Sequence, residues 1–454
     1  MKKTNTPITH LCLLFFGVLF IISSCKKNTD TIFPSPVLES ESAAQKTHTK
    51  KYSAEVAQKW LDLQLRILYL SGSNPYSLNG NRQFAYMGVA LYEAVVPGMP
   101  SYQSLHGQLN AMPQMPTTKN GDDYHWPAAA NTALAFLTRN FYPTASAALK
   151  TSVDSLESAL NAAYAGEAGA PTYLRSTEFG KEVAQRIFNW AQADNSQTIY
   201  SGYIASTDPT KWSNTTPNPT GVVAPYWGLN RQFVSGSFNN TASPPPPMYS
   251  TDPASEYYKM VKEVYDISQT LTNEQKATAL YFRDNPGYQS GTHYQYIFNQ
   301  VMKDENLTLD AFAVAQAKAG IAMAEAQINC WQQKYTILLD RPTKYIRNVL
   351  GHSTWSSFLA MPGHPDYPSG HSQTGGAFAK VMTSLLGENY PITLHTYDNL
   401  GMAPRPYNSF FEMADDIGKS RVYGGIHYTY SCTEGNKQGA KIAANILNKL
   451  KFKR

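Results

Sequence analysis

Apolar residues recur every three or four positions along much of the chain, which is the pattern of an amphipathic helix. Residues 53–70 show it clearly, with Val56, Trp60 and Ile67 among the apolar positions. Residues 126–164 are rich in alanine and leucine and have few helix breakers, and residues 174–194 resemble them. The strict alternation that marks a half-buried strand is scarce. The sequence therefore predicts an all-α fold of packed helical bundles.

Further helical segments with recognisable starts follow in the C-terminal part of the chain. Residues 309–339 contain eight alanines, and alanine both favours helix and lets neighbouring helices approach closely. Thr272-x-x-Gln275 and Ser409-x-x-Glu412 have the form of capping boxes, in which two side chains satisfy main-chain donors at a helix start. The other predicted helices are residues 371–387, 409–421 and 434–451.

A long segment rich in Pro, Ser, Thr, Asn and Gly, residues 197–254, separates these helical regions. Irregular segments of this length usually have a task, such as covering a site or a partner surface. We therefore expect an N-terminal helical half over residues 52–270, which includes this segment. A C-terminal helical half then spans residues 271–454.

The N-terminus has the features of an export signal. Two lysines precede an apolar run from Leu11 to Ile22, which is too short to span a bilayer, and small residues follow it. The end of this segment resembles the lipobox of bacterial lipoproteins, which implies a signal peptide over residues 1–24 and lipidation of Cys25. An ordinary signal peptide is the alternative. Residues 25–51 are polar and suit a flexible tether, so we expect an exported protein anchored to the lipid bilayer of the cell envelope.

The net charge disfavours one class of function, and the cysteines leave two possibilities open. Loss of residues 1–24 removes two lysines and no acidic residue, which lowers the formal net charge from +5 to +3. Because no run of basic residues appears either, nucleic-acid binding is disfavoured. Cys330 and Cys432 remain in a compartment that permits disulfides, and they are either a pair or two buried thiols.

Three short stretches carry the candidate chemistry. In "KYTILLDRP", Lys334 and Arg341 are seven residues apart, close to two helical turns, so we expect both cations to point the same way before Pro342 ends the helix. In "PSGH", Ser369 and Gly370 lie just before a predicted helix, whose start offers main-chain donors to an anion.

The third stretch, "SRVYGGIH", places Arg421 six residues before His427, with two glycines that interrupt the helix between them. Arginine suits bidentate binding of phosphate-like oxygens. With Lys334 and Arg341, this residue completes a predicted set of three cations around one oxyanion.

Lys-x6-Arg-Pro, Pro-Ser-Gly-His and Ser-Arg-x5-His, in this order, resemble the three-part signature of vanadium-dependent haloperoxidases and the type 2 phosphatidic acid phosphatase superfamily. The segments "AEAQINCWQQKY", "RPTKYIR" and "SRVYGGIHY" are similar to bacterial haloperoxidases in particular. The resemblance implies that vanadate or phosphate is bound through its equatorial oxygens, that His427 is the axial ligand or nucleophile, and that His371 is the acid–base residue. The implied oxyanion-binding residues are Lys334, Arg341, Ser369, Gly370 and Arg421.

The chain departs from this family pattern at two places. Relatives usually carry an aspartate three or four residues after the last histidine, where this chain has Tyr430 and Ser431. The ring of His427 must then be oriented by Ser431, a main-chain carbonyl or a more distant group. Asp340 replaces an aromatic residue that is common before the Arg-Pro pair, and the sequence is compatible with a side chain that points to solvent.

The resemblance implies a vanadate-dependent haloperoxidase that oxidises halide with hydrogen peroxide. Two alternatives are a phosphomonoesterase that works through a phosphohistidine, and a non-catalytic oxyanion-binding lipoprotein. His364, seven residues before His371, resembles the second histidine of the bromoperoxidases and favours bromide and iodide over chloride. The alternative for His364 is a solvated loop histidine. Trp331 could cover the site but is equally well explained as a core residue. Asp284 could orient an arginine but is better explained as a turn residue.

Overall fold

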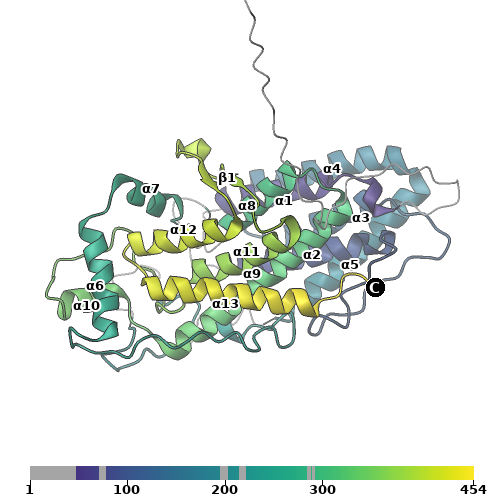
Figure 1. Cartoon of the computed structure of the whole chain (residues 1–454). Helices are drawn as coiled ribbons and strands as arrows, with labels where there is room; N and C mark the ends of the chain where they lie inside the picture. Colours follow the sequence, from purple (N-terminus) through teal and green to yellow (C-terminus); the bar gives the residue numbers. More distant parts are fainter. Residues whose placement is uncertain (1–47, 71–77, 195–202, 214–220, 284–287, 289–291) are drawn as a thin grey trace, which may run out of the picture.

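The computed structural model describes residues 48–70, 78–194, 203–213, 221–283, 288 and 292–454. The predicted signal peptide, Cys25 and nearly all of the predicted tether lie outside the described residues. Within them, no helix is both long enough and apolar enough to cross a membrane. The regular secondary structure in the described part of the chain is almost entirely helical, which confirms the all-α prediction (Figure 1).

The first group of helices lies at one end of the molecule, on the right in Figure 1. The predicted helix over residues 126–164 is in fact two helices, because the chain turns at Tyr142 and Pro143 and Ser146 caps the start of the second. The helices of this group are α1 (Glu55–Leu70), α2 (Asn79–Val95), α3 (Trp126–Phe141), α4 (Ala147–Ala168) and α5 (Ala170–Gln192).

The second group begins with helices at the opposite end and continues into the centre of the molecule. One antiparallel pair of short strands, β1 (Ile392–Leu394) and β2 (Arg405–Tyr407), accompanies it. The helices are α6 (Glu256–Gln269), α7 (Asn273–Tyr281), α8 (His293–Asp304), α9 (Leu309–Ile337), α10 (Pro342–Asn348), α11 (Gly370–Leu386), α12 (Phe410–Tyr423) and α13 (Thr429–Lys449). The capping box at Thr272 and Gln275 is present at the start of α7.

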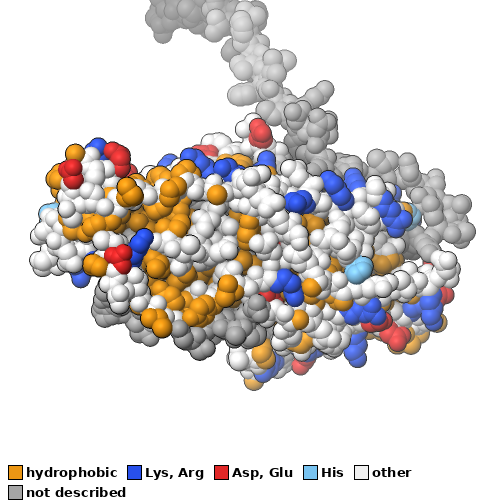
Figure 2. All heavy atoms as spheres, turned by 90° about the horizontal axis from the view of Figure 1, so that it is seen from below, with side chains coloured by type: hydrophobic (Ala, Val, Ile, Leu, Met, Phe, Trp, Pro, Cys, Tyr) orange, Lys and Arg blue, Asp and Glu red, His pale blue; other side chains and the backbone are white. Residues whose placement is uncertain are grey.

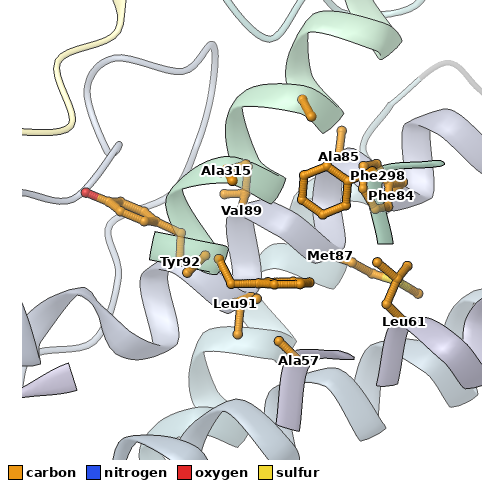
Figure 3. Packing of buried hydrophobic residues seen from close by; sticks show 14 of the residues in the cluster. Ala57, Leu61, Phe84, Ala85, Met87, Val89, Leu91, Tyr92, Phe298 and Ala315 are labelled. Carbon is orange, nitrogen blue, oxygen red and sulfur yellow. The ribbon is translucent and has the colours of Figure 1, made fainter. Parts of the chain in front are cut away.

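Helix α9 is the central element, because it packs against α2 on one side and against α11 and α13 on the other. Figure 3 shows part of this core, where Val89 of α2 lies against Ala315 of α9. One continuous hydrophobic cluster runs from α1 to α13, so both groups of helices share a core. The predicted division of the chain at residue 270 stays a prediction.

The irregular segment has little regular structure over residues 203–213 and 221–254, apart from the short 3-10 helix η4 (Trp227–Leu229). Its main chain bonds to the loops of the C-terminal half: Val223 donates to the carbonyl of Gly363, and the carbonyl of Pro244 accepts from Tyr367. The segment therefore supports the loop that contains the Pro-Ser-Gly-His motif. It also carries exposed apolar side chains, among them Met248, and Figure 2 shows hydrophobic side chains gathered on the face seen from below.

Helices α11 and α13 make the closest helix pair, and glycine makes their approach possible. A Cβ on Gly439 of α13 would overlap the main-chain carbonyl of Gln373 in α11. Because backbone cannot move aside as a flexible side chain can, any larger residue must push the two helices apart. These helices carry Ser369 and Ser431 at or near their starts, so their spacing also sets the geometry of the signature residues.

We predict that Gly439→Ala lowers the free energy of unfolding by about 1–3 kcal/mol, since overpacking a tight contact costs that much. The matched control is Gly166→Ala in α4, where an added Cβ meets nothing within 4 Å. Because Gly166 is an exposed helical position, Gly166→Ala should raise the free energy of unfolding by up to about 0.5–1 kcal/mol, since alanine is the better helix former. Urea unfolding of both variants measures the difference, and equal effects at the two sites would contradict this account of the helix contact.

Candidate active site

The three signature stretches come from separate elements and meet where α9, α11 and α12 converge on the start of α13. Arg341 is not on the same helix as Lys334, which corrects the prediction from spacing. Helix α9 ends at Ile337 because Leu338 adopts a left-handed conformation with φ 55°. A separate helix, α10, then begins at Pro342, with Arg341 as its N-cap.

Lys334 lies in the last turn of α9 and is fully buried. Its ammonium donates to the carbonyls of Pro365 and Asp366, at 2.8 and 2.7 Å, so the loop before the Pro-Ser-Gly-His motif holds the head group in place. Burial lowers the pKa of Lys334 to about 8, and the nearby charge of Arg341 acts in the same direction. A bound anion would reverse this effect, because it stabilises the protonated ammonium.

Arg341 connects the two histidine-bearing loops. Its Nε donates to the carbonyl of His364 at 2.9 Å, and Nη1 donates to the carbonyl of Ile426. Nη1 also lies 3.1 Å from Nε2 of His427, and Nη2 lies 3.0 Å from Nδ1 of His364. The guanidinium is buried, and burial is the largest cause that lowers its pKa.

Arg421 and the start of α11 complete the cationic side of the site. Arg421 is buried at the end of α12, and its Nη1 donates to the carbonyl of Phe282 at 2.6 Å. Its charge contributes to the lowered pKa values of both Arg341 and His427, which places it within electrostatic range of both. Ser369 is the N-cap of α11, so the main-chain donors of the first turn are directed at this same region.

Gly370 follows Ser369, and its lack of a side chain makes room for an aromatic ring. A Cβ at this position would lie 3.1 Å from Cζ3 of Trp331. The indole is buried, with its ring centre 5.2 Å from that of His364 and 5.8 Å from the Lys334 ammonium. Trp331 is therefore part of the wall of the site. Asp284 lies outside the described residues.

His427 is buried in the loop before α13, and burial, together with the charges of Arg341 and Lys334, lowers its pKa well below 6.5. A guanidinium can only donate, so Nε2 beside Arg341 carries no proton. Its other ring nitrogen, Nδ1, lies 3.1 Å from Oδ2 of Asp366. The neutral ring thus has its proton on Nδ1 and its lone pair on Nε2.

Asp366 is the site residue that sequence reasoning missed. It lies three residues before Ser369 in the motif loop, and its side chain is fully buried. Burial raises its pKa to about 6, although Arg341 and Lys334 oppose that shift. The signal available in the sequence was an acidic residue next to the signature, in a chain whose usual aspartate is absent.

The two remaining histidines, His364 and His371, are both half-buried but differ in their contacts. His371 is half-buried in the first turn of α11, and its carbonyl accepts a hydrogen bond from Tyr294 at 2.9 Å. His364 is held by Arg341, and burial and the charges of Lys334 and Arg341 lower its pKa well below 6.5.

The structure also shows where the Asp340 side chain lies and whether the two cysteines form a disulfide. Asp340 does not point to solvent: it is buried, accepts from the main-chain NH of Arg341 at 2.9 Å and pairs with Lys344 at 3.0 Å. Cys330 and Cys432 are free, buried thiols. Burial raises the pKa of Cys330 to about 11 and that of Cys432 to about 12, so both stay protonated near neutral pH.

Taken together, the site concentrates positive charge around a neutral imidazole. Three buried cations, Lys334, Arg341 and Arg421, surround His427, and Asp366 supplies the buried carboxylate in contact with its ring. Such a cluster binds an oxyanion favourably, because the anion restores the charge balance that burial has disturbed. A base with a bare Nε2 beside that oxyanion is also suited to form a bond to its central atom.

The comparisons with known proteins point the same way. Residues 315–453 match the family model described as the second helical-bundle domain of VCPO. The chain has 31% identity and a TM-score of 0.79 to a solved structure described as the first bacterial vanadium-dependent iodoperoxidase, and the match covers 88% of this chain and 97% of that one. The chain belongs to the vanadium haloperoxidase superfamily.

More distant haloperoxidase structures share the fold. A bacterial vanadium-dependent chloroperoxidase in its holo form has 18% identity and a TM-score of 0.65, covering 90% of this chain and 98% of that one. An apo form of a bacterial vanadium-dependent chloroperoxidase has 16% identity and a TM-score of 0.63, and the match covers 83% of this chain and 94% of that one. No curated protein matches.

We predict that Arg341→Ala and Arg421→Ala each weaken the binding of inorganic phosphate and vanadate roughly ten- to hundredfold. A hydrogen bond to a charged group contributes about 1.5–3 kcal/mol, which corresponds to that range. Calorimetric titration of the folded variants measures it. Arg139→Ala, which removes an exposed ion-paired arginine of α3, is the control and should bind as the wild type does. Wild-type affinity in both site variants would place the oxyanion elsewhere.

Proposed function

We propose that this haloperoxidase-family protein uses vanadate and hydrogen peroxide to oxidise halide, with iodide and bromide favoured over chloride. Oxyanion binding is supported by three buried cations, of which Arg341 lies 3.1 Å from Nε2 of His427 while Lys334 and Arg421 lie close enough to lower the pKa of His427. The 31% identical iodoperoxidase structure, matched over nearly its whole length, favours this activity over that of a phosphomonoesterase.

The residues present fit vanadate as the resident group. Lys334, Arg341 and Arg421 would supply charged donors, and the start of α11 would supply main-chain donors. His427 would hold the vanadium through Nε2. When bound, vanadate supplies a Lewis-acid centre that activates peroxide toward a halide nucleophile.

The protein's own part of the reaction is proton transfer and exclusion of water. His371 is half-buried at the start of α11, so its imidazole has access both to the site and to solvent. We assign it the role of accepting the first proton of hydrogen peroxide and returning a proton to the leaving oxygen. Trp331 and His364 form a wall over the cations and limit the access of water.

His364 would act as a neutral hydrogen-bond donor. Nδ1 lies 3.0 Å from Nη2 of Arg341, which can only donate, and 3.2 Å from the carbonyl of Pro365, which can only accept. We propose that the closer contact, to Arg341, decides the tautomer and places the proton of the neutral ring on Nε2. A fixed N–H donor in the wall of the site would stabilise bound peroxide or a departing halogen species without a change of charge.

A paired assay on the purified protein tests the proposed function. Wild-type protein supplied with vanadate, peroxide and iodide should oxidise iodide, whereas hydrolysis of a generic phosphomonoester should be slow. His427→Ala should lose vanadate-dependent oxidation and keep the wild-type unfolding transition. Phosphoester hydrolysis without halide oxidation would instead identify the phosphatase, and anion binding with neither activity would identify a non-catalytic binder.

The halide preference gives a separate prediction for His364. Its replacement by alanine should lower kcat/KM for iodide and bromide about two- to tenfold, because one neutral hydrogen bond contributes about 0.5–1.5 kcal/mol. Wild-type turnover with chloride should be negligible. His395→Ala, which changes an exposed histidine paired with Asp398, is the control. Efficient chloride oxidation by the wild type, or unchanged halide kinetics in His364→Ala, would remove this role.

A further inference from the structure

The axial histidine contacts a carboxylate that comes from a different part of the chain than the family pattern predicts. We propose that Asp366, held by Ser431, is the positioning residue that orients His427 and strengthens its Nε2 as a ligand. This inference rests on the proposed function, in which His427 is the axial ligand. The position four residues after His427, where relatives usually carry an aspartate, holds Ser431.

The first step is the contact between the two side chains. Oδ2 of Asp366 lies 3.1 Å from Nδ1 of His427, and both residues are buried. The two atoms are within hydrogen-bond distance, but their orientation does not meet strict hydrogen-bond geometry. Catalytic hydrogen bonds are often poorly aligned before the ligand binds, and we propose that this one becomes aligned when the oxyanion binds.

The second step is that Asp366 is fixed at both its main chain and its side chain. Its NH donates to the carbonyl of Leu339 at 3.0 Å, and its own carbonyl accepts from the Lys334 ammonium at 2.7 Å. Its Oδ1 accepts from the hydroxyl of Ser431. This leaves Oδ2 facing His427, so the carboxylate cannot turn away without breaking the bond to Ser431.

Ser431 joins this unit to the oxyanion-binding loop. It lies in the first turn of α13, four residues after His427, and its carbonyl accepts from the NH of Ser369 at 3.1 Å. The serine therefore connects the start of α11, the carboxylate and the histidine loop. A hydroxyl at this position does not orient the ring itself but fixes the carboxylate that does.

The third step concerns the proton of the ring. Arg341 can only donate toward Nε2, and a carboxylate 3.1 Å from Nδ1 favours a proton on that nitrogen, so both neighbours favour the same tautomer. A carboxylate that accepts from the far nitrogen of a ligating histidine makes the near nitrogen more basic, and the loss of such a partner typically costs about 10–100-fold in metal affinity.

If Asp366 acted only as a nearby negative charge, neutralising it would have the opposite effect on the affinity for simple anions. Removing one negative charge from the site should by itself tighten the binding of any oxyanion. Only an oxyanion that bonds to Nε2 should bind less tightly when the carboxylate is neutralised. Vanadate can form that bond and sulfate cannot, so the two anions separate the two roles.

The experiment is therefore calorimetric titration of Asp366→Asn with vanadate and, separately, with sulfate, in the absence of peroxide and halide. We expect vanadate to bind about 10–100-fold more weakly, and sulfate to bind as tightly as to the wild type or more tightly. Asp340→Asn, a buried carboxylate next to Arg341 that does not contact His427, is the control and should leave the vanadate-to-sulfate affinity ratio unchanged. A wild-type ratio in Asp366→Asn would overturn the proposal.

A second measurement does not depend on vanadate. Histidine-selective 15N spectra of the ligand-free wild type should show His427 protonated at Nδ1, and Asp366→Asn and Ser431→Ala should shift the population toward the other tautomer. A wild-type proton on Nε2 would overturn the proposal. If the tautomer behaves as expected but the wild type binds no vanadate, the proposed function fails and the positioning role stands.

The exchanged pair Asp366→Ser with Ser431→Asp provides the rescue. Each single change should lower the affinity for vanadate, the first by removing the carboxylate and the second by placing two carboxylates side by side. The double variant restores one carboxylate and one hydroxyl to the same space, and it should bind vanadate more tightly than Asp366→Ser alone. No recovery in a double variant that unfolds as the wild type does would contradict a role for the carboxylate in orienting the ring.

Discussion

The burial of three like charges in one pocket is the constraint on which the rest of the site depends. Lys334, Arg341 and Arg421 are all nearly inaccessible to solvent, and taking an ion out of water costs several kcal/mol even in a relaxed protein. The protein offsets part of this cost with main-chain carbonyls, which accept from each of these side chains. Carbonyls hold a cation without neutralising it, and Asp366, whose Oδ2 lies 3.7 Å from Nη1 of Arg341, offsets only part of the positive charge. We therefore expect the pocket to prefer an anion.

This constraint explains why irregular backbone surrounds the site. Carbonyls inside a helix are already bonded, so those that accept from the cations come from loops and from the chain just beyond a helix end, such as the carbonyls of Pro365 and Phe282. The loops in turn need rigid supports. The close pair α11 and α13 and the irregular segment around Val223 and Pro244 provide them.

Much of the fold and most of the site could be predicted from the sequence because both follow local rules. The period of apolar residues predicts the helices, and the Pro-Ser-Gly-His motif predicts a helix start at Gly370. The errors come from places where a single residue or a distant contact overrides the pattern. Leu338 in a left-handed conformation ends α9 before Arg341, and the turn at Tyr142 and Pro143 divides one predicted helix into two.

Asp366 was missed for a different reason, since its role depends on a contact between residues that are far apart in the chain. Its side chain meets Ser431, 65 positions later, and no periodicity or local motif encodes such a pair. The burial of Asp340 shows the same limit, because an acidic residue before an Arg-Pro pair looks solvent-exposed until the fold brings other groups around it.

A ring of cations around an imidazole suits any tetrahedral oxyanion that can become five-coordinate, so this part of the site does not by itself separate an oxidase of halides from a phosphatase. Residues that do not bind the oxyanion must therefore distinguish the two reactions. Trp331, packed on Gly370, and His364, held neutral by Arg341, form a wall beside the cations. A wall of an indole and a neutral imidazole favours a small polarisable halide over the hydrated, charged body of a phosphoester. We therefore propose that this wall favours halide oxidation, whereas the cations and the Asp366–His427 pair would set how firmly the oxyanion is held.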